Sequence, residues 1–356
     1  MGRARTLAET YRRFGEVDLA GTSPIYERVA VALSESDRSL RAIEAAPARR
    51  RQPALILATL HDLALAGRAP ALAAAYEATD SEAAASAAID TLLRMTDDVV
   101  ALAGRRKAGS DETGRHTVLH PAIAEVARRA GASAIGLIDV GRAAALNLTV
   151  DLVGVTYDDG RSRGDPSSPV QLTASIVGGR PVPATPLPEV VARIGVDRDP
   201  LDVDDTDDAR WLRACVGPDQ PARAARVDAE IALARSVPRR LLQGDPVDVL
   251  PDALDLVPAA ALPVVITTWA LSAFPVERRR RFLRRLEDAA ASRPVAWVAV
   301  EGVGVAPSIP TFGDRPASGH SIIGLATFDG SAGLAEAVGR CWSRGRLLSW
   351  LADTST

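Results

Sequence analysis

Small and acidic residues stand directly after several apolar runs of this chain, and they are the residues best placed to do chemistry. Gly141 follows the run that ends at Val140, and residues 141–145 keep a small side chain at every second position. Asp197 and Asp245 follow two later apolar runs. Small residues let a backbone come close to a ligand, and carboxylates accept hydrogen bonds from hydroxyl and amino groups. Together they indicate a ligand-binding loop flanked by two acceptors.

These residues can act together only if the strands that precede them lie side by side. After His120, short apolar runs alternate with helical segments, which is typical of a parallel sheet with helices on both faces. In such sheets, ligands bind beyond the carboxyl ends of the strands. The expected strands cover residues 134–140, 190–196, 239–243, 262–268, 295–300 and 321–330. The expected helices cover residues 121–130, 143–151 and 276–291, parts of 211–235, and the first part of 334–350, before a closing strand.

The sequence predicts two domains. Residues 1–108 show helix after helix and few β-branched runs, so they predict an all-α N-terminal domain. Residues 109–356 predict a Rossmann-like α/β domain with a mainly parallel sheet. Gly, Pro and Ser are frequent at about 155–189, where we expect an inserted hairpin and loop. We expect the N-terminal helices to cover the carboxyl edge of the sheet as a lid.

Composition argues against several classes of partner. The 356 residues carry a formal net charge of −3, which favours neither nucleic acid nor an anionic membrane. The uncharged stretch 256–276 contains three prolines and predicts a buried strand rather than a membrane span. Two distant cysteines and an N-terminus without an apolar segment favour the cytoplasm. We therefore expect a cytoplasmic protein with a small-molecule substrate, no nucleic-acid or membrane partner, and a homodimer as the assembly to consider.

No metal is expected. His116 and His120 are four residues apart, a spacing that could chelate a metal on one helix. Pro121 is predicted to begin a new helix, so the two imidazoles would not share helical geometry. The acidic run at 199–208 lacks the glycine and final glutamate of a calcium loop, and it predicts a solvated loop.

Further residues at strand ends complete the predicted site. Thr267 and Trp269 close the fourth strand and could form the floor of a pocket, and Trp211 could cover its edge. A reaction that removes a proton needs a general base within reach of the substrate. The candidates for that role are Glu301, Glu112, Tyr157 and His320.

The order of these pieces resembles class I S-adenosylmethionine-dependent methyltransferases over roughly residues 111–350. The pieces are an acid-x-Gly loop at 139–141, Gly-Val-Asp-x-x-Pro at 195–200, Gly-Asp at 244–245, and an arginine-rich helix after the fourth strand. The resemblance implies S-adenosylmethionine as cofactor, with its ribose at Asp197 and its adenine at Asp245. It implies cofactor-binding roles for Asp139, Gly141, Arg142, Ala143, Asn147, Asp197, Asp245, Thr267 and Trp269, and substrate-binding roles for Glu112, Arg115 and Trp211.

The whole chain also resembles a narrower group, the bacterial domain of unknown function family 2332. The stretches that carry this resemblance are GTSPIYERVA (21–30), QPALILATLHDLALAG (52–67), DETGR (111–115), RIGVDRDPLDVDD (193–205), RWLRACVGPD (210–219) and LLQGD (241–245). The first loop of that family reads Glu-Leu-Gly-Ala-Ser-Ala-Gly-Leu-Asn-Leu. This chain has Asp139, Arg142, Ala143 and Ala145 in place of its Glu, Ala, Ser and second Gly. The resemblance implies a methyltransferase-like fold and no particular reaction.

Two functions follow from these patterns. The first is a methyltransferase that acts on a small bacterial metabolite, and the second is a non-catalytic binding or assembly protein with the same fold. The enzyme should have an open pocket above Gly141, between Asp197 and Asp245, whereas the second should have Arg142 folded into it. A nicotinamide-dependent oxidoreductase is less favoured, because its first loop would carry more glycine.

Overall fold

The chain forms two compact units. The computed structural model describes residues 6–108, 113–141, 144–330 and 333–353. The helical unit comprises residues 1–111 together with 204–228, and the α/β unit comprises the remaining residues, 112–203 and 229–356. From the sequence, residues 204–228 were predicted to belong to the α/β domain. In the structure, this segment belongs to the helical unit instead.

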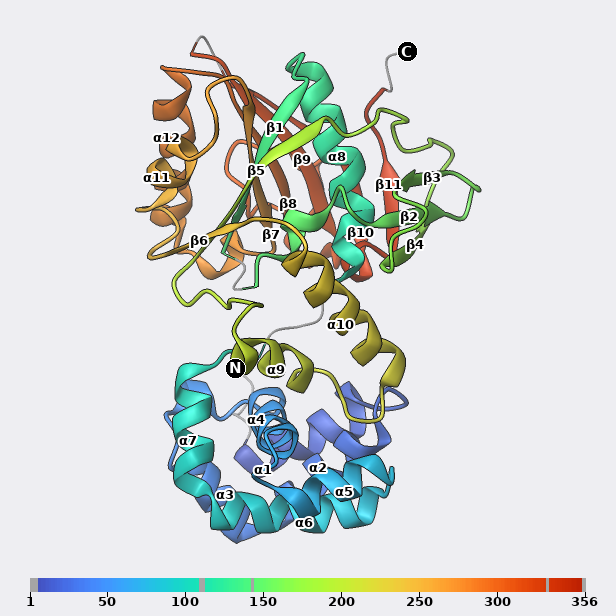
Figure 1. Ribbon diagram of the computed structural model, residues 1–356, viewed down its shortest axis with the longest axis vertical. Helices are drawn as coiled ribbons and strands as arrows, with labels where there is room; N and C mark the ends of the chain where they lie inside the picture. Colours follow the sequence, from blue (N-terminus) through green and yellow to red (C-terminus); the bar gives the residue numbers. More distant parts are fainter. Residues whose placement is uncertain (1–5, 109–112, 142–143, 331–332, 354–356) are drawn as a thin grey trace. The chain divides into compact units, whose positions relative to one another are not determined.

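The most buried helix of the helical unit is α4 (Pro53–Leu65), in which every residue from 55 to 64 is buried. Its sequence, PALILATLHDLAL, is apolar on nearly every side, and such a helix is stable only with other helices around it. The other α-helices of this unit are α1 (Leu7–Arg13), α2 (Pro24–Glu35), α3 (Asp37–Glu44), α5 (Pro70–Glu77), α6 (Ser81–Arg94), α7 (Thr96–Arg105) and α9 (Thr206–Ala214) (Figure 1).

Polar contacts attach residues 204–219 to the N-terminal helices of the same unit. The Asp219 carboxylate accepts a hydrogen bond from the backbone amide of Ile25, in the first turn of α2, at 2.9 Å. Asp62 of α4 forms an ion pair with Arg210 of α9 at 3.0 Å, and the Asp62 side chain is 5% exposed. Buried charged groups are stable only when paired. These contacts therefore fix the position of residues 204–219 relative to α2 and α4.

In the described part of the α/β unit, eleven strands form one mixed, mostly parallel sheet in the order β3-β2-β4-β11-β10-β9-β8-β7-β1-β5-β6 (Figure 1). The strands are β1 (Ala134–Val140), β2 (Gly154–Tyr157), β3 (Ser162–Gly164), β4 (Gln171–Ile176), β5 (Glu189–Asp197), β6 (Arg240–Gln243), β7 (Leu262–Thr268), β8 (Val295–Gly302), β9 (Ser321–Phe328), β10 (Leu334–Trp342) and β11 (Leu347–Trp350).

The five strands β8-β7-β1-β5-β6 are parallel to one another. From β1, the chain adds β5 and β6 on one side and β7 and β8 on the other. The two directions of winding meet between β1 and β7, where Val140 pairs with Thr267. In open α/β sheets, ligands bind outside the carboxyl ends of the strands at such a switch point. The fold therefore directs attention to the residues that follow β1 and β7.

The two faces of the sheet pack against different helices. On one face, Leu137 of β1 belongs to the same core as α8 (His116–Arg129). On the other face, Val140 belongs to the core that includes α11 (Leu250–Asp255) and α12 (Val276–Ala290). Side chains of a strand alternate between faces, so each position near the carboxyl edge can be assigned to one side.

One helix begins earlier than the sequence predicted. α8 runs from His116 to Arg129 and contains Pro121, which was expected to begin it. Proline has no N–H and cannot bond the carbonyl four residues before it. Here that carbonyl, of Thr117, accepts a hydrogen bond from the Tyr157 hydroxyl at 2.7 Å. The phenol replaces the missing backbone bond, so the helix continues through the proline.

Two other helix predictions are wrong. In place of a helix over 143–151, the described residues contain only the short 3-10 helix η4 (Leu146–Thr149). The preceding residue, Ala145, has a left-handed φ of 49°, which an α-helix does not contain. The segment after Leu334 forms strand β10, because antiparallel pairing with β9 outweighs the helical propensity of LAEAVGR.

The strand predictions are confirmed. β1 and β7 have the predicted bounds, and β5, β6 and β8 differ from prediction by one or two residues. The expected hairpin of the insertion is formed by β2 and β3, and β4 pairs in parallel with β2. These runs were recognisable because strands buried on both faces are nearly continuous in apolar residues.

Among the described residues, no single helix is long and apolar enough to cross a membrane. α4 and α5 together meet that test by length and composition, with a bend of 99° between them. The uncharged stretch 256–276 contains β7, which is buried along its whole length, as the prolines and β-branched residues predicted.

Candidate functional site

Three polar side chains reach the same face of the sheet at its carboxyl edge. Asp139 of β1, Asp197 of β5 and Thr268 of β7 alternate with residues of the α11–α12 core, so they point to the α8 face. Their exposed fractions are 0%, 8% and 0%. Because β5, β1 and β7 are neighbours, the three side chains lie at the switch point.

A chain of hydrogen bonds joins buried polar side chains at this point. Asn147 donates from Nδ2 to Asp139 Oδ1 at 3.0 Å and to Thr268 Oγ1 at 3.2 Å. Arg115 donates from Nη1 to the same Thr268 oxygen at 3.0 Å. None of the four residues is more than 4% exposed. A buried polar network is costly unless its members are satisfied, so it specifies one geometry.

Trp269, the residue after β7, is held in an unusual conformation. Its φ is 49°, in the left-handed region that a bulky residue rarely adopts. Its indole Nε1 donates to Ser321 Oγ at 2.6 Å, and the guanidinium carbon of Arg115 lies 4.9 Å from its ring centroid. Strained conformations of this kind persist where the surrounding structure fixes them, and they concentrate at functional sites.

The first loop is tightly packed on both sides. Gly141 has a φ of 75°, and a Cβ built on it would lie 2.9 Å from Ala270 Cβ, so only glycine fits. Ala145 packs against Gly195 of β5, where a Cβ would lie 2.6 Å from the Ala145 methyl. Gly195 therefore leaves the space that the Ala145 side chain occupies. The predictions for Arg142, Ala143 and Glu112 lie outside the described residues.

Asp197 ends β5 with its carboxylate oriented by the chain that follows. Its Oδ1 accepts a hydrogen bond from the backbone amide of Asp199 at 2.9 Å. Its carbonyl oxygen accepts from the amide of Gly244 at 3.0 Å, which ties the end of β5 to the end of β6. The carboxylate thus has a defined position at the carboxyl edge, where the sequence predicted it.

Asp245 follows β6 and is engaged by two arginines. Its carboxylate forms ion pairs with Arg198 and Arg278, and it accepts a hydrogen bond from the amide of Val247 at 3.0 Å. Its side chain is 19% exposed. A ligand that used this carboxylate would therefore have to compete with two guanidinium groups.

Thr267 and Glu301 are turned to the opposite face of the sheet. Thr267 Oγ1 accepts a hydrogen bond from Trp297 Nε1 at 3.0 Å, within the α11–α12 core. Glu301 Oε1 accepts from the amides of Ala270 and Leu271 at 3.1 and 3.2 Å. One oxygen of the Glu301 carboxylate is therefore bonded to the backbone that follows β7.

Two other candidates for a general base have structural partners. Tyr157 donates its hydroxyl proton to the Thr117 carbonyl, and burial raises the pKa of its phenol above the ordinary value. His320 Nε2 lies 2.8 Å from Asp314 Oδ2, and its other ring nitrogen faces a backbone carbonyl. A hydrogen bond from Arg340 to the same Asp314 lowers the pKa of that carboxyl group. Both ring nitrogens of His320 therefore face oxygen atoms.

Trp211 is a core residue of the helical unit. It is 1% exposed, and its indole Nε1 donates to the carbonyl oxygen of Lys107 at 3.0 Å. The guanidinium of Arg106 lies 5.9 Å from its ring centroid. These packing contacts are enough to explain why a tryptophan stands at this position of α9.

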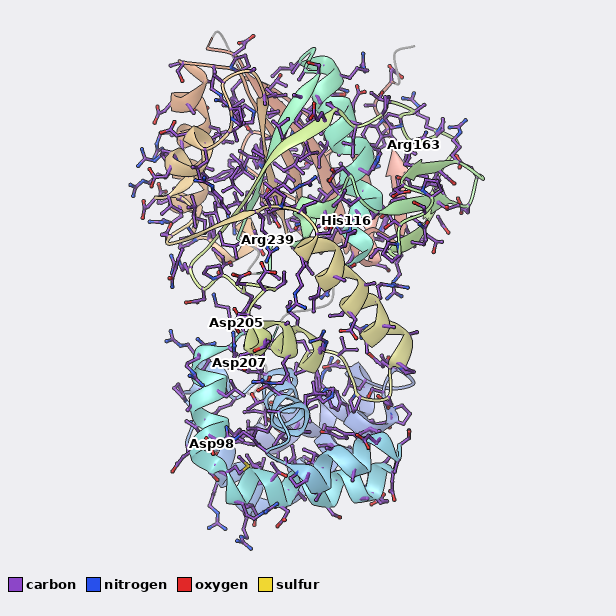
Figure 2. All side chains as sticks on the ribbon, in the orientation of Figure 1. Asp98, His116, Arg163, Asp205, Asp207 and Arg239 are labelled. Atoms are coloured by element: carbon purple, nitrogen blue, oxygen red, sulfur yellow. The ribbon has the colours of Figure 1, made fainter. Side chains whose placement is uncertain are left out.

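Within the part of the chain that the structure describes, no group of three or more His, Cys, Asp or Glu side chains could hold a metal ion. His116 and His120 do share one helix, contrary to the prediction. His116, which is labelled in Figure 2, has its Nε2 atom 3.1 Å from the Leu146 carbonyl oxygen. Burial lowers the pKa of His120 to about 4. In the acidic run 199–208, Asp205 caps α9 by accepting two of its backbone amides (Figure 2).

Sequence patterns placed the Thr-Thr-Trp stretch 267–269 at the site but singled out Thr267 rather than Thr268, and they gave Ser321 no role there. The signal for Thr268 was present, because alternation along PVVITTW puts the second threonine on the same face as the apolar residues that pack on α8. Nothing in the sequence pairs Ser321 with Trp269, which lies 52 residues earlier in the chain.

Comparison with known proteins identifies a family for this chain. A protein-family model described as "Uncharacterized protein conserved in bacteria (DUF2332)" matches residues 8–350. No curated protein matches the chain. Since the family model covers nearly the whole sequence, the chain belongs to the DUF2332 family of uncharacterized bacterial proteins.

Proposed function

We propose that this chain binds S-adenosylmethionine and transfers its methyl group to a small bacterial metabolite. The observation that carries the proposal is the set of buried polar side chains where the winding of the sheet reverses, between β1 and β7. Sheets of this kind bind nucleotide-like ligands at that point. Together with this function we infer a methyltransferase-type fold, in which the sheet has a Rossmann-like core.

In this proposal, the cofactor lies along the carboxyl ends of β5, β1 and β7. Gly141 lets the backbone come close to it, at a place where any side chain would meet Ala270. The Asp197 carboxylate accepts hydrogen bonds from the two ribose hydroxyls. Asp139 and Asn147 act by holding the first loop against β7.

The chemistry needs alignment more than it needs reactive side chains. When bound, the cofactor supplies an electrophilic methyl group that the acceptor takes by in-line displacement. Such a reaction is accelerated by fixing the two reactants and by excluding water. The bonds of Glu301 and Tyr157 to backbone groups argue against them as general base, and so do the contacts of His320 with Asp314 and a backbone carbonyl. Glu112 is the candidate that we retain.

Calorimetric titration with S-adenosylhomocysteine tests this proposal. The wild-type protein should bind with a micromolar Kd. Asp197→Asn should weaken binding by about ten-fold or more, because a hydrogen bond to a charged group contributes about 1.5–3 kcal/mol. Asp252→Asn is the matched control, because Asp252 is an exposed residue of α11. Failure to bind at millimolar ligand would contradict the proposal.

A non-catalytic binding or assembly protein is the second candidate function. The ion pairs of Asp245 with Arg198 and Arg278 favour it, since they occupy a carboxylate that adenine would otherwise use. The left-handed conformation of Ala145 also favours it, because alanine adopts that conformation less readily than glycine. Under this alternative, S-adenosylhomocysteine should bind neither the wild-type protein nor Asp197→Asn.

A further inference from the structure

A buried guanidinium lies at the same switch point. Arg115 is 3% exposed, and its Nη1 donates to Thr268 Oγ1 at 3.0 Å. Its guanidinium carbon is 4.9 Å from the ring centroid of Trp269, and the indole is itself held by Ser321. A hydrogen bond at one end and an aromatic ring across its face fix both the position and the plane of the guanidinium.

The backbone that carries Arg115 is also fixed. Arg115 ends the 3-10 helix η3 (Thr113–Arg115), which packs against the turn η7 (Ser343–Gly345) between β10 and β11. A Cβ built on Gly114 would lie 2.9 Å from the Arg344 carbonyl oxygen. Arg344 itself has a φ of 57°, in the left-handed region. The turn η7 therefore packs directly against the backbone that carries Arg115.

A guanidinium fixed in this way is suited to one class of ligand group. Its N–H donors form a planar fork that matches a carboxylate or a phosphate, and a lysine cannot replace it. S-adenosylmethionine has no phosphate, but its amino-acid end carries an α-carboxylate. We propose that Arg115 binds this α-carboxylate, an assignment that rests on the proposed function and replaces the substrate-binding role expected from the sequence.

The layout of the strands agrees with that assignment. Asp197 ends β5, Thr268 ends β7, and β1 lies between them. Neighbouring strands are about 4.8 Å apart, so these two positions are separated by about 10 Å across the sheet. One sulfur and three carbon atoms separate the ribose C5′ from the carboxylate carbon. With ribose at Asp197, the amino-acid end therefore extends across β1 toward Thr268 and Arg115.

The test compares two ligands that differ in one group. S-adenosylhomocysteine and its decarboxylated analogue share the adenosine, the sulfur and the amine, and both can be titrated calorimetrically into the full-length protein. The wild-type protein should bind S-adenosylhomocysteine at least about ten-fold more tightly than the analogue. Equal affinities would overturn the proposal and leave the proposed function standing. If neither ligand binds, the proposed function itself fails, and this proposal with it.

A variant of Arg115 then tests whether this residue causes the difference in affinity between the two ligands. Arg115→Gln should weaken S-adenosylhomocysteine binding by about ten- to a hundred-fold and change the affinity for the analogue by less than about three-fold. Arg284→Gln, at an exposed position of α12, should change neither. Equal loss of both ligands in a variant that still melts cooperatively would make Arg115 merely structural. If Arg115→Gln does not fold, the wild-type ratio between the two ligands still decides the question.

Discussion

At the scale of single residues, two hydroxyl groups form hydrogen bonds with buried polar groups of the backbone and of side chains. The Tyr157 hydroxyl bonds the Thr117 carbonyl left without an amide by Pro121. The Thr268 hydroxyl accepts hydrogen bonds from both Asn147 and Arg115. In both places one oxygen atom determines whether buried polar groups are satisfied.

Tyr157→Phe should therefore destabilise the protein. The variant leaves the Thr117 carbonyl buried without its partner, and an unsatisfied buried group costs about 1–3 kcal/mol. Tyr76→Phe is the matched control, because the Tyr76 hydroxyl is also buried but has no hydrogen-bond partner among the described residues. It should not destabilise the protein and should instead raise the free energy of unfolding, because it removes a buried hydroxyl that has no partner among the described residues. Urea unfolding measures both, and equal effects would contradict this account.

How far the site could be predicted depends on how local its contacts are. Asp139 and Asp197 were predictable, because each closes a continuous apolar run that forms a buried strand. The partners of Thr268 were not, because Asn147 and Arg115 lie 121 and 153 residues away along the chain. Thr268 lies close to these two residues because of the order of the strands in the sheet. Local sequence patterns do not predict that order.

At the scale of elements, the first loop is the part whose sequence and conformation agree least. Residues 143–151 predicted a helix because alanine and leucine favour one, yet Ala145 adopts a left-handed conformation and only η4 follows. The helix predicted in the first part of 334–350 is wrong for a related reason, because pairing with β9 outweighs the helical propensity of these residues. Both errors occur where tertiary contacts override local preference.

Ala145→Gly should relieve the strain in the first loop. An alanine in the left-handed region costs roughly 1–2 kcal/mol relative to its normal conformation, whereas glycine enters that region freely. We expect the variant to be more stable by about 1 kcal/mol. Ala101→Gly, at an exposed position inside helix α7, should instead lose about 0.5–1 kcal/mol. Urea unfolding that showed the same sign for both variants would contradict the strain argument.

At the scale of the whole molecule, the chain passes between the two units at residues 111–112, 203–204 and 228–229. The helical unit therefore cannot be predicted from the first 108 residues alone, since α9 arrives from the middle of the sequence. Local patterns predicted a helix within 211–235 and a loop at 199–208, so the first turn of α9 was wrongly predicted as loop. They also do not say which unit α9 joins. That is decided by polar partners such as Asp62 and Arg210, 148 residues apart.

The stability of both units should fall on mild acidification. Burial lowers the pKa of His61 in the helical unit and of His120 in the α/β unit from 6.5 to about 4. Between those two values the unfolded chain binds a proton that the folded chain does not, so stability falls as pH falls. The loss begins below about pH 6.5, and it reaches at most roughly 3 kcal/mol for each histidine near pH 4.

Urea unfolding between pH 7.5 and pH 4.5 measures this dependence. His61→Gln, which cannot be protonated, should flatten the pH dependence of the free energy of unfolding of the helical unit. His120→Gln is the control, because it should flatten the pH dependence of the α/β unit and leave that of the helical unit unchanged. A pH dependence unchanged in His61→Gln would contradict the assignment.

The most direct test of the central claim is whether the switch point between β1 and β7 binds S-adenosylhomocysteine. One calorimetric series suffices, with the wild-type protein, Asp197→Asn and Asp252→Asn titrated under the same conditions. This account predicts micromolar binding that Asp197→Asn weakens by about ten-fold or more and Asp252→Asn leaves unchanged. Wild-type protein that binds no ligand at millimolar concentration, or that binds equally well without the Asp197 carboxylate, would contradict it.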